Sequence, residues 1–379
     1  MSPLWEKAQL VIETLIHAGH EAYFVGGAVR DYLLQRPISD VDIVTSATID
    51  EVIILFPQTI EVGTAHETVI VKIEDDLFEV SRYKGKEPRT LEQDLFLRDF
   101  TVNAIALTKD FVLIDPHQYK VDLDYSVIRA SGCANDRFKE DPLRMVRAVR
   151  FISQLGFSIE QETRQAMLEL KASLSLVANE RLAKEIDKLL LGPYCSKAIA
   201  VLHHVQFSSL PILPKELIDW MNHPLYNEMT LEERWFLLLR DVHHPVETQL
   251  RYFKKSNRFM KELQELQTYV NKRKTEGWSL RLLYDCGKAT IIKVERLIHL
   301  LHPEKKESIQ HLLDKYEHLR LKKRQDLAIN GSLLLHETTR EPGSWIEGCL
   351  HEVETAVIYG ELPNEKNEIL AWSRKKGLL

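Results

Sequence analysis

The chain has 379 residues, of which 44% are hydrophobic and 28% are charged, the ordinary balance of a soluble globular protein. Its formal net charge of −6 argues, on average, against a nucleic-acid partner, and no apolar run approaches the length of a membrane span. The four cysteines are far apart and form no zinc-binding motif. We therefore expect a protein of the reducing cytoplasm that makes no membrane contact.

The first part of the chain is predicted to alternate strands with helices. An amphipathic helix begins it, and β-branched runs bounded by turn residues then predict strands. The predicted strands are 21–26, 40–45, 66–73, 76–83, 101–107 and 111–116, with helices at 28–35 and 48–56.

Beyond about Asn135 the strand patterns stop. Long patterns of helical period follow, for example at 141–157 and 179–193. The sequence therefore predicts a head of strands and helices followed by a wholly helical remainder.

Two glycines join the first predicted strand to the helix that follows it. Gly26 and Gly27 let the backbone approach a ligand closely, and the helix N-terminus offers free N–H groups to a phosphate. Arg30 adds a positive charge near the same place. The glycine pair alone also fits a plain tight turn, but its order with Arg30 and the aspartates that follow favours a phosphate site.

Asp40 and Asp42 lie two residues apart in the second predicted strand, a spacing that points both side chains to one face. The two carboxylates repel each other unless a cation lies between them. Oxygen ligands beside a phosphate favour Mg²⁺, so we predict a magnesium site, although a lone pair of this kind also fits a turn cap. Glu79 is the candidate third carboxylate for a two-metal transfer of nucleotidyl groups, with a solvent-facing strand residue as an equal alternative.

A second polar group lies at 94–107, where a loop enters an apolar strand. It consists of Arg98, Asp99 and Asn103. Arg98 is suited either to a structural pair with Asp99 or to a contact with a ribose or phosphate, and the residues alone leave both readings open.

The helix predicted at 141–157 carries arginines at a spacing of three. Arg144, Arg147 and Arg150 form a slowly turning strip along one side. Such a strip is usually a ladder of surface ion pairs, but beside a phosphate site it also fits a reader of nucleotides. Asp141 and Arg144 supply an acceptor and donors of the kind that match a base edge.

A basic cluster occurs later in the chain. Residues 251–274 contain eight Lys or Arg and two Glu, a local surplus able to bind phosphates in an acidic protein. By itself, such a cluster is usually a solvated helix face. The candidate RNA contacts are Lys254, Lys255, Arg258, Lys272, Arg273 and Lys274.

Together these motifs resemble those of the bacterial class II tRNA nucleotidyltransferases, the CCA-adding family, and more distantly the bacterial poly(A) polymerases. The resemblance covers nearly the whole chain. The matching segments are 23–31 with 40–45 (metal and triphosphate), 97–106 (ribose), 137–151 (a protein template for the base), 178–193 (a helix-stabilising element of the neck) and 327–362 (tail).

The resemblance implies a polymerase-β-like nucleotidyltransferase head with a mixed sheet and helices, followed by all-α neck, body and tail. The implied division is a catalytic head at 1–135, a neck with the base template at 136–195, a body at 196–302 and a tRNA-binding tail at 303–379.

The resemblance also implies roles for individual residues. Asp40 and Asp42 would bind Mg²⁺, and the Asp and first Arg of the template motif would select the base. The tRNA 3′ hydroxyl would attack the α-phosphate of CTP, or of ATP in a full CCA-adding enzyme, with release of pyrophosphate. The predicted nucleotide-binding residues are Gly26, Gly27, Arg30, Arg98, Asp99, Asn103, Asp141, Arg144, Arg147 and Arg150.

The chain departs from the family pattern at three places. Leu97 stands where the ribose motif usually has a further arginine, and His66-Glu67-Thr68 stands where His-Gly-Thr is common. Between Glu79 and Arg98 the chain is shorter than CCA-adding relatives, which carry a flexible loop there. A shortened loop is similar to that of the CC-adding enzymes, which leave the terminal adenosine to a separate enzyme.

The loop has a physical role in this reading, because one pocket must accept cytosine first and adenine later, and a mobile loop is able to readjust it. Its loss would spare the chemistry and remove the switch. We therefore predict CC addition, with full CCA addition as the alternative. A poly(A) polymerase and an inactive RNA-binding protein are further alternatives.

Overall fold

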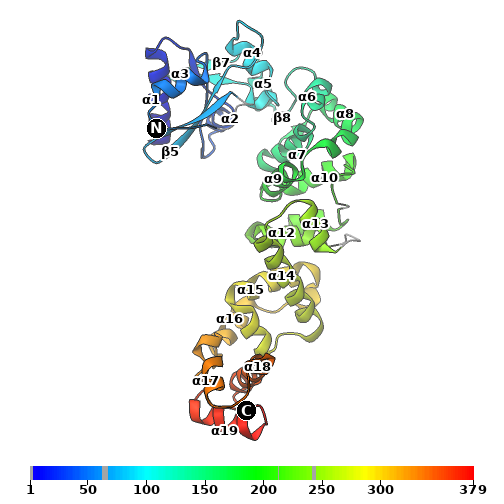
Figure 1. Ribbon diagram of the computed structural model, residues 1–379. Helices are drawn as coiled ribbons and strands as arrows, with labels where there is room; N and C mark the ends of the chain where they lie inside the picture. Colours follow the sequence, from blue (N-terminus) through cyan, green and yellow to red (C-terminus); the bar gives the residue numbers. More distant parts are fainter. Residues whose placement is uncertain (1–2, 62–66, 212, 241–244) are drawn as a thin grey trace. The chain divides into compact units, whose positions relative to one another are not determined.

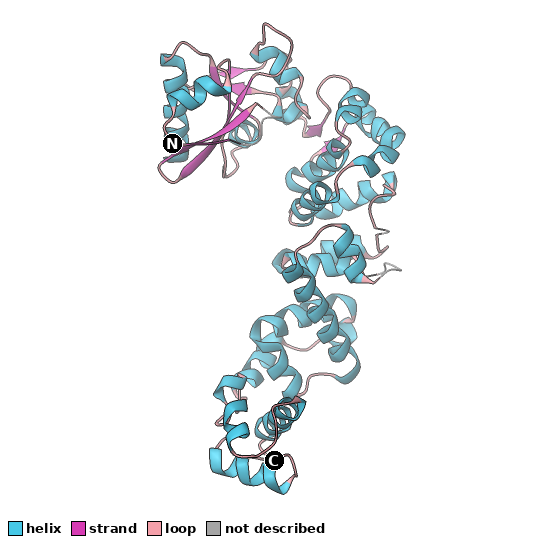
Figure 2. Ribbon diagram, in the orientation of Figure 1, coloured by secondary structure: helices cyan, strands magenta, loops and turns pink. Residues whose placement is uncertain are grey.

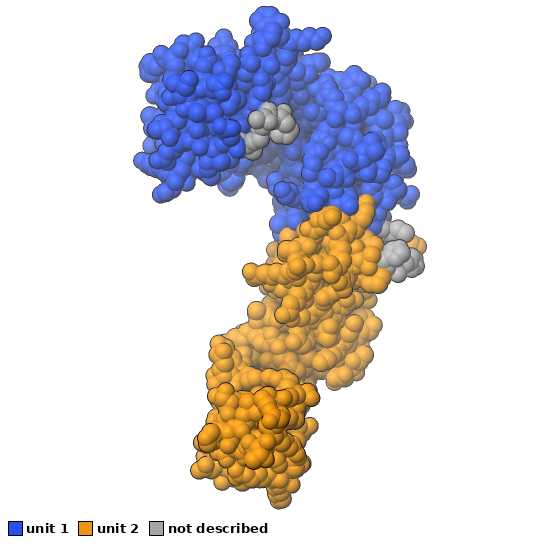
Figure 3. Space-filling model, in the orientation of Figure 1, with its two compact units in different colours: residues 1–211 blue, residues 212–379 orange. Residues whose placement is uncertain are grey.

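The computed structural model describes residues 3–61, 67–211, 213–240 and 245–379. The chain divides into two compact units, residues 1–211 and 212–379, which Figure 3 colours separately. In Figure 2 the strands gather in the first unit, and the described elements of the second unit are helices. Within the described ranges, no helix combines the length and apolar character that a membrane span requires.

The sheet of the head has seven strands: β1 (Ala22–Val25), β2 (Asp42–Thr45), β3 (Thr59–Glu61), β4 (Thr68–Ile73), β5 (Asp76–Arg82), β6 (Ala106–Leu107) and β7 (Leu113–Ile114). Their order across the sheet is β3-β4-β5-β2-β1-β6-β7. The β2–β5 pair is parallel and the other neighbours are antiparallel, so the sheet is mixed, as predicted. The site described below lies at the β1–β2–β5 centre of this sheet (Figure 1).

Short helices accompany the sheet: α1 (Pro3–His17), α2 (Gly27–Leu33), α3 (Ile49–Leu55), α4 (Leu91–Phe96) and α5 (Lys120–Asp124), with a 3-10 helix at Thr101–Asn103. Helix α1 buries Ala8, Val11, Ile12 and Leu15, which recur at helical spacing and form one apolar face. Helix α3 begins with a capping box, because Thr48 and Glu51 satisfy each other's backbone N–H groups.

The rest of the first unit is helical apart from a two-stranded parallel pair. Its elements are β8 (Val127–Ile128), α6 (Ala134–Glu140), α7 (Leu143–Leu155), β9 (Ser158–Ile159), α8 (Gln161–Leu170), a 3-10 helix at Lys171–Leu176, α9 (Asn179–Leu190) and α10 (Cys195–Val205). Helix α7 packs on α9 and α10. It ends at Gly156, whose φ of 74° is the left-handed conformation that glycine adopts readily.

The second unit is described as helices: α11 (Leu217–Asn222), α12 (Leu231–Leu238), α13 (Val246–Tyr252), α14 (Asn257–Glu276), α15 (Leu280–Leu301), α16 (Ile309–Glu317), α17 (Gly331–His336), α18 (Ser344–Tyr359) and α19 (Lys366–Lys375), with 3-10 turns at Pro224–Glu228, Pro303–Lys305 and Arg324–Asp326. Helix α15 bends at Gly287, which has non-helical dihedral angles. Helices α15 to α19 share one apolar core.

The structure confirms the mixed head and the mostly helical remainder, with three corrections. The remainder is not wholly helical, because Ser158–Ile159 pairs with Val127–Ile128. The strand predicted at 101–107 is a 3-10 helix followed by the two-residue β6. Strand β2 begins at Asp42, so Asp40 precedes it, because the antiparallel partner strand β1 ends where Gly27 begins α2.

Candidate active site

The β1–α2 turn brings the backbone against the first acidic group. Register pairs Val25 with Asp42, and Gly26 follows with a φ of 75°, a conformation that residues with a side chain rarely adopt. A Cβ at Gly26 would lie 2.9 Å from Oδ2 of Asp42 and 3.6 Å from Nη1 of Arg98. A glycine is therefore required here by conformation and by space. The backbone at Gly26 lies close to the Asp42 and Arg98 side chains, whereas the predicted approach was to a ligand.

The carboxylates meet across the parallel β2–β5 pair. Asp42 and Glu79 are register partners on adjacent strands, while the exposed Asp40 accepts a hydrogen bond from the Ser39 hydroxyl. Burial, followed by the negative charges of Glu79 and Asp40, raises the pKa of Asp42 to about 6, although Arg98 opposes the shift. The sheet thus sets Glu79 beside Asp42, and Asp40, just before β2, is near enough for its charge to act on Asp42.

The donor chemistry of this group fits a divalent cation. A cation beside Asp42 would relieve the repulsion that raises its pKa, and carboxylate oxygens are ligands that Mg²⁺ prefers. Across the described ranges, no three His, Cys, Asp or Glu side chains form a ready-made metal cluster. The acidic group is therefore suited to a cation that takes its other ligands from outside the chain, as Mg²⁺ does with phosphates.

Arg98 is held by an aspartate that the sequence analysis did not select. The Asp94 side chain is 1% exposed, and its Oδ2 accepts from Nε and Nη2 of Arg98 at 3.0 and 2.9 Å. Its Oδ1 accepts from the backbone N–H of Lys84 at 3.0 Å. Asp94 lies on α4, a helix not predicted from the sequence, so its burial had no local signal. The alternative pair of Arg98 with Asp99 is replaced by this i,i+4 pair.

Arg30, Asn103 and Asp99 form a hydrogen-bonded chain behind the acidic group. Nη1 of Arg30 donates to Asn103 Oδ1 at 2.8 Å, and Asn103 Nδ2 donates to Asp99 Oδ1 at 3.2 Å. Asp99 Oδ2 then accepts two bonds from Arg147, at 3.0 and 2.6 Å. The Arg30 guanidinium also pairs with Asp31, which engages both its Nε and Nη2. These hydrogen bonds link α2, the 3-10 helix and α7.

Asp99→Asn is expected to lower the free energy of unfolding by about 1–3 kcal/mol at neutral pH, the range for hydrogen bonds to charged groups. Burial opposes ionisation of Asp99, yet the Arg147 charge and the hydrogen bonds outweigh it and hold the pKa below the ordinary 3.8. A lowered pKa stabilises the fold above the ordinary value and loses that effect as the pH falls through the folded value. Urea unfolding of both proteins should show a constant difference between pH 5 and 7 that shrinks below about pH 4. A difference that grows on acidification would contradict this assignment.

The three arginines of the strip on α7 differ in exposure. Each step of three residues rotates a side chain by about 60° around the helix, so Arg150 lies well away from Arg144. Side-chain exposure is 17% for Arg144, 35% for Arg147 and 9% for Arg150. Arg150 pairs with Glu185 and lies over the Phe151 ring at 3.9 Å. Arg30 and Arg147 lie over the same ring at 5.4 and 5.9 Å, so Arg150 stays beside two other predicted nucleotide-binding residues, and its own contact with the nucleotide stays a prediction.

Helix α9 contacts residues of the segment that the family resemblance assigns to a base template. Arg181 Nη2 donates to Asp141 Oδ2 at 2.7 Å, and Glu185 lies 3.7 Å from Arg147 while pairing with Arg150. Arg144 Nη1 donates to Glu140 Oε2 at 2.7 Å. Arg181 and Glu185 were not selected from the sequence, where only their helix was recognised as a stabilising element.

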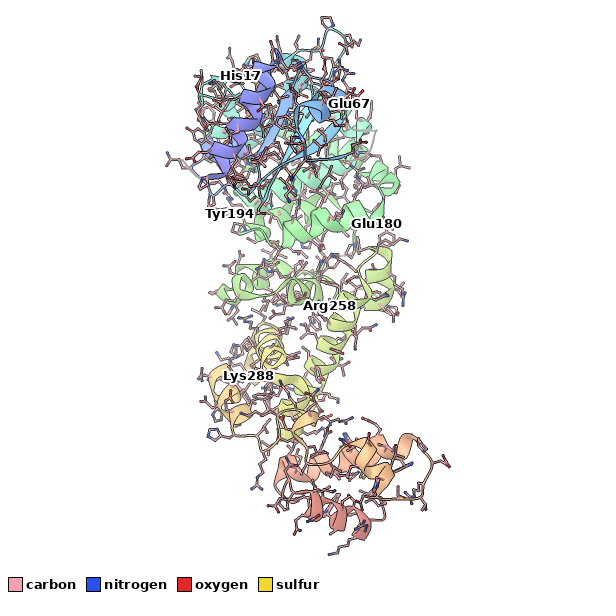
Figure 4. The ribbon with its side chains drawn as sticks, turned by 60° about the vertical axis from the view of Figure 1, so that its left-hand side comes forward. His17, Glu67, Glu180, Tyr194, Arg258 and Lys288 are labelled. Carbon is pink, nitrogen blue, oxygen red and sulfur yellow. The ribbon has the colours of Figure 1, made fainter. Side chains whose placement is uncertain are left out.

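The connection from β5 to α4, residues 83–90, is fixed at several points. The Lys86 N–H donates to Gln93 Oε1 at 3.0 Å, and Arg82 pairs with Glu87 at 3.0 Å. Glu67, labelled in Figure 4, also pairs with Arg82 on the neighbouring strand. His66 begins the His66-Glu67-Thr68 segment, where the family commonly has His-Gly-Thr, and it lies outside the described residues.

The basic cluster of the second unit is only partly exposed. Arg273 is 4% exposed and pairs with Glu295, and Lys255 lies over the Trp235 ring at 4.5 Å. The structure thus corrects the prediction for Arg273, whose guanidinium is buried and paired rather than free for RNA. Arg258, labelled in Figure 4, is near the start of α14 with its side chain 89% exposed. The exposed candidates are Lys254, Arg258, Lys272 and Lys274.

Three family descriptions match successive parts of the chain. "Poly A polymerase head domain" matches residues 22–129, "Probable RNA and SrmB- binding site of polymerase A" matches 156–213, and "tRNA nucleotidyltransferase domain 2 putative" matches 228–373. The first match contains the strands that carry the acidic group, and the third covers most of the second unit.

Whole-length relatives were also found. The chain is 39% identical to a CCA-adding enzyme of Anoxybacillus flavithermus, with 98% of each chain covered, and 36% identical to one of Bacillus cereus, with 99% covered. Its fold is similar to the crystal structure of the Bacillus stearothermophilus CCA-adding enzyme in complex with CTP. That similarity has a TM-score of 0.88 at 34% identity and covers 100% of this chain and 98% of the other.

Proposed function

We propose, from the premise that this chain belongs to the bacterial CCA-adding family of tRNA nucleotidyltransferases, that it adds CMP residues from CTP to the 3′ end of tRNA. Protein side chains, and no nucleic-acid template, would select the nucleotide. The observation that carries this proposal is the meeting of Asp42, Glu79 and Arg98 in one site of the head. The relative of known structure that binds CTP supports the choice of nucleotide.

Asp40 and Asp42, with Glu79 beside them, would hold Mg²⁺. When bound, this ion would lower the pKa of the tRNA 3′ hydroxyl and stabilise the pyrophosphate that leaves. The rigid β1–α2 turn keeps Asp42 against the backbone of Gly26, which fixes the carboxylate before substrate arrives. Arg98, held by Asp94, supplies positive charge where the phosphates would lie.

Selection of the base would fall to Asp141 and Arg144 on the turn into α7. Asp141 accepts from the amino group of cytosine, and the Arg144 guanidinium donates to ring acceptors. Arg181 orients Asp141, and Glu140 orients Arg144, so neither side chain swings freely. Arg147 would act through Asp99, since both its bonds to that carboxylate link α7 with the head.

The finer proposal is that addition stops after two cytidines. The β5–α4 connection is short and tied to both of its neighbours, so it is poorly suited to act as a lever that readjusts the pocket for adenine. A separate enzyme would then add the terminal adenosine. Full CCA addition is the second candidate, favoured by the names of the relatives, which are CCA-adding enzymes.

The remaining proposals concern RNA binding and domain boundaries. The exposed cations Lys254, Arg258, Lys272 and Lys274 of the second unit would contact tRNA phosphates. The head at 1–135, neck at 136–195, body at 196–302 and tail at 303–379 would be the functional divisions, of which the body crosses the boundary between the two compact units after residue 211.

One assay separates the candidates. The full chain is given Mg²⁺, tRNA that lacks its 3′ end, and CTP with or without ATP, and the product is sized on a sequencing gel. We expect two added residues whether or not ATP is present. A third residue that appears only with ATP identifies full CCA addition, a long adenosine tail identifies a poly(A) polymerase, and tRNA binding without extension identifies an inactive binding protein.

A further inference from the structure

Lys84 occupies a fixed position next to the acidic group but has no role in the function proposed above. The residue before it, Tyr83, is 1% exposed; its N–H donates to the Thr45 carbonyl at 2.9 Å and its hydroxyl to Glu21 at 3.1 Å. The N–H of Lys84 itself donates to the buried Asp94 at 3.0 Å. The backbone is therefore held on the N-terminal side of the Cα atom that directs this side chain.

The charged neighbours of Lys84 come from two elements. Burial, then the positive charge of Arg98 and, less strongly, that of Arg144 lower the pKa of Lys84, while Asp94 and Asp99 oppose the shift. Arg98 and Asp94 belong to the end of α4 and the residues after it, and Arg144 belongs to α7. Lys84 as a whole residue nevertheless stays exposed to solvent, so a ligand can reach its side chain.

The cations near Lys84 are already paired. Arg98 binds Asp94, Arg144 binds Glu140, and Arg147 binds Asp99. The Lys84 ammonium forms no ion pair or hydrogen bond with the part of the chain that the structure describes. An ammonium ion that neighbouring cations repel, and that no carboxylate pairs with directly, is suited to an anionic ligand.

We propose that the Lys84 ammonium binds the triphosphate of the incoming nucleotide. This inference rests on the proposed nucleotidyl transfer and extends it to a residue that neither the motifs nor the metal site include. A chain of contacts supports the triphosphate as the ligand. Asp94 joins the Lys84 backbone to Arg98, and Arg98 approaches the same glycine, Gly26, as Asp42 does. The RNA strand is the other source of phosphate, and the experiment below distinguishes the two.

The test is calorimetric titration of the full chain with CTP, with CMP and with tRNA that lacks its 3′ end. Lys84→Met is expected to raise the dissociation constant for CTP about tenfold, the loss of one charge-assisted contact. The constants for CMP and tRNA should change less than about twofold on the same scale. Lys84→Arg should restore CTP binding, because it keeps the charge, whereas a loss of packing would not be restored in this selective way.

Lys72→Met is the matched control, since Lys72 is an exposed lysine on β4 of the same head. It removes the same charge and should leave CTP binding unchanged. Lys84→Gln is the second neutral variant and should behave like Lys84→Met. Unchanged CTP affinity in both neutral variants overturns the inference, as does weaker binding of tRNA with normal binding of CTP. If the unmodified protein binds no CTP, the proposed function itself fails, so the two failures are distinct.

Discussion

Asp42→Ala is expected to reduce CMP addition by about 10³-fold or more, because it removes the carboxylate at the centre of the acidic group. Binding of tRNA should change less than about twofold, since phosphate contacts elsewhere in the chain supply most of the affinity. Incorporation of radiolabelled CMP and filter binding of tRNA measure the two quantities on the same preparations.

Asp75→Ala is the control for this experiment. Asp75 is an exposed carboxylate in the turn between β4 and β5, outside the site, and its removal should leave both measurements unchanged. If Asp42→Ala adds CMP at a rate near that of the unmodified protein, the acidic group is not the catalytic centre. If both variants lose activity together, the loss reflects the net charge of the head and not the site.

Glu295→Ala is expected to lower the free energy of unfolding of the second unit by about 3–5 kcal/mol, because it leaves the Arg273 guanidinium buried without its main partner. Glu295 is 0% exposed and accepts bonds from Arg273 at 3.1 Å, from the Trp278 ring N–H at 2.8 Å and from the Glu307 N–H at 2.6 Å. Urea unfolding of the full chain, followed by circular dichroism, measures the change.

A double substitution separates the buried charge from simple loss of packing. Arg273→Met with Glu295→Leu removes both charges and should recover most of the loss, because neither ion then remains unpaired. Glu276→Ala, an exposed carboxylate on the same helix as Arg273, should change stability by less than about 0.5 kcal/mol. Equal losses in the single and double variants would show that the ion pair itself, and not the unpaired charge, is responsible.

Arg273 shows that a run of charged residues does not by itself predict which of them are exposed. The run of lysines and arginines at 251–274 predicted a basic surface, and α14 does expose Arg258 and Lys272. The same helix turns Arg273 inward onto Glu295, which lies on the next helix. Helical period places Arg273 on the buried face of α14, three residues after Val270, but its partner is brought to it only by packing of α14 on α15.

Local patterns in the sequence were enough to place the motifs in order and to predict most of the elements that carry them. Strand residues before Gly26, the aspartates at 40 and 42, and the helix with Arg144 each have a local pattern, because hydrophobic period and turn chemistry act between near neighbours in the chain. These patterns were enough to predict a head of strands and helices followed by a mostly helical remainder, which the structure confirms.

Which side chains meet in the site could not be predicted from local patterns and is known from the packed fold. The parallel register of β2 and β5 sets Glu79 beside Asp42, and burial of Asp94 joins Arg98 to Lys84. Packing of α9 on α7 sets Glu185 beside Arg147 and Arg150. Strand register and burial depend on contacts between segments that are distant in the chain. Those contacts form only in the packed molecule, so no local stretch of sequence reveals them.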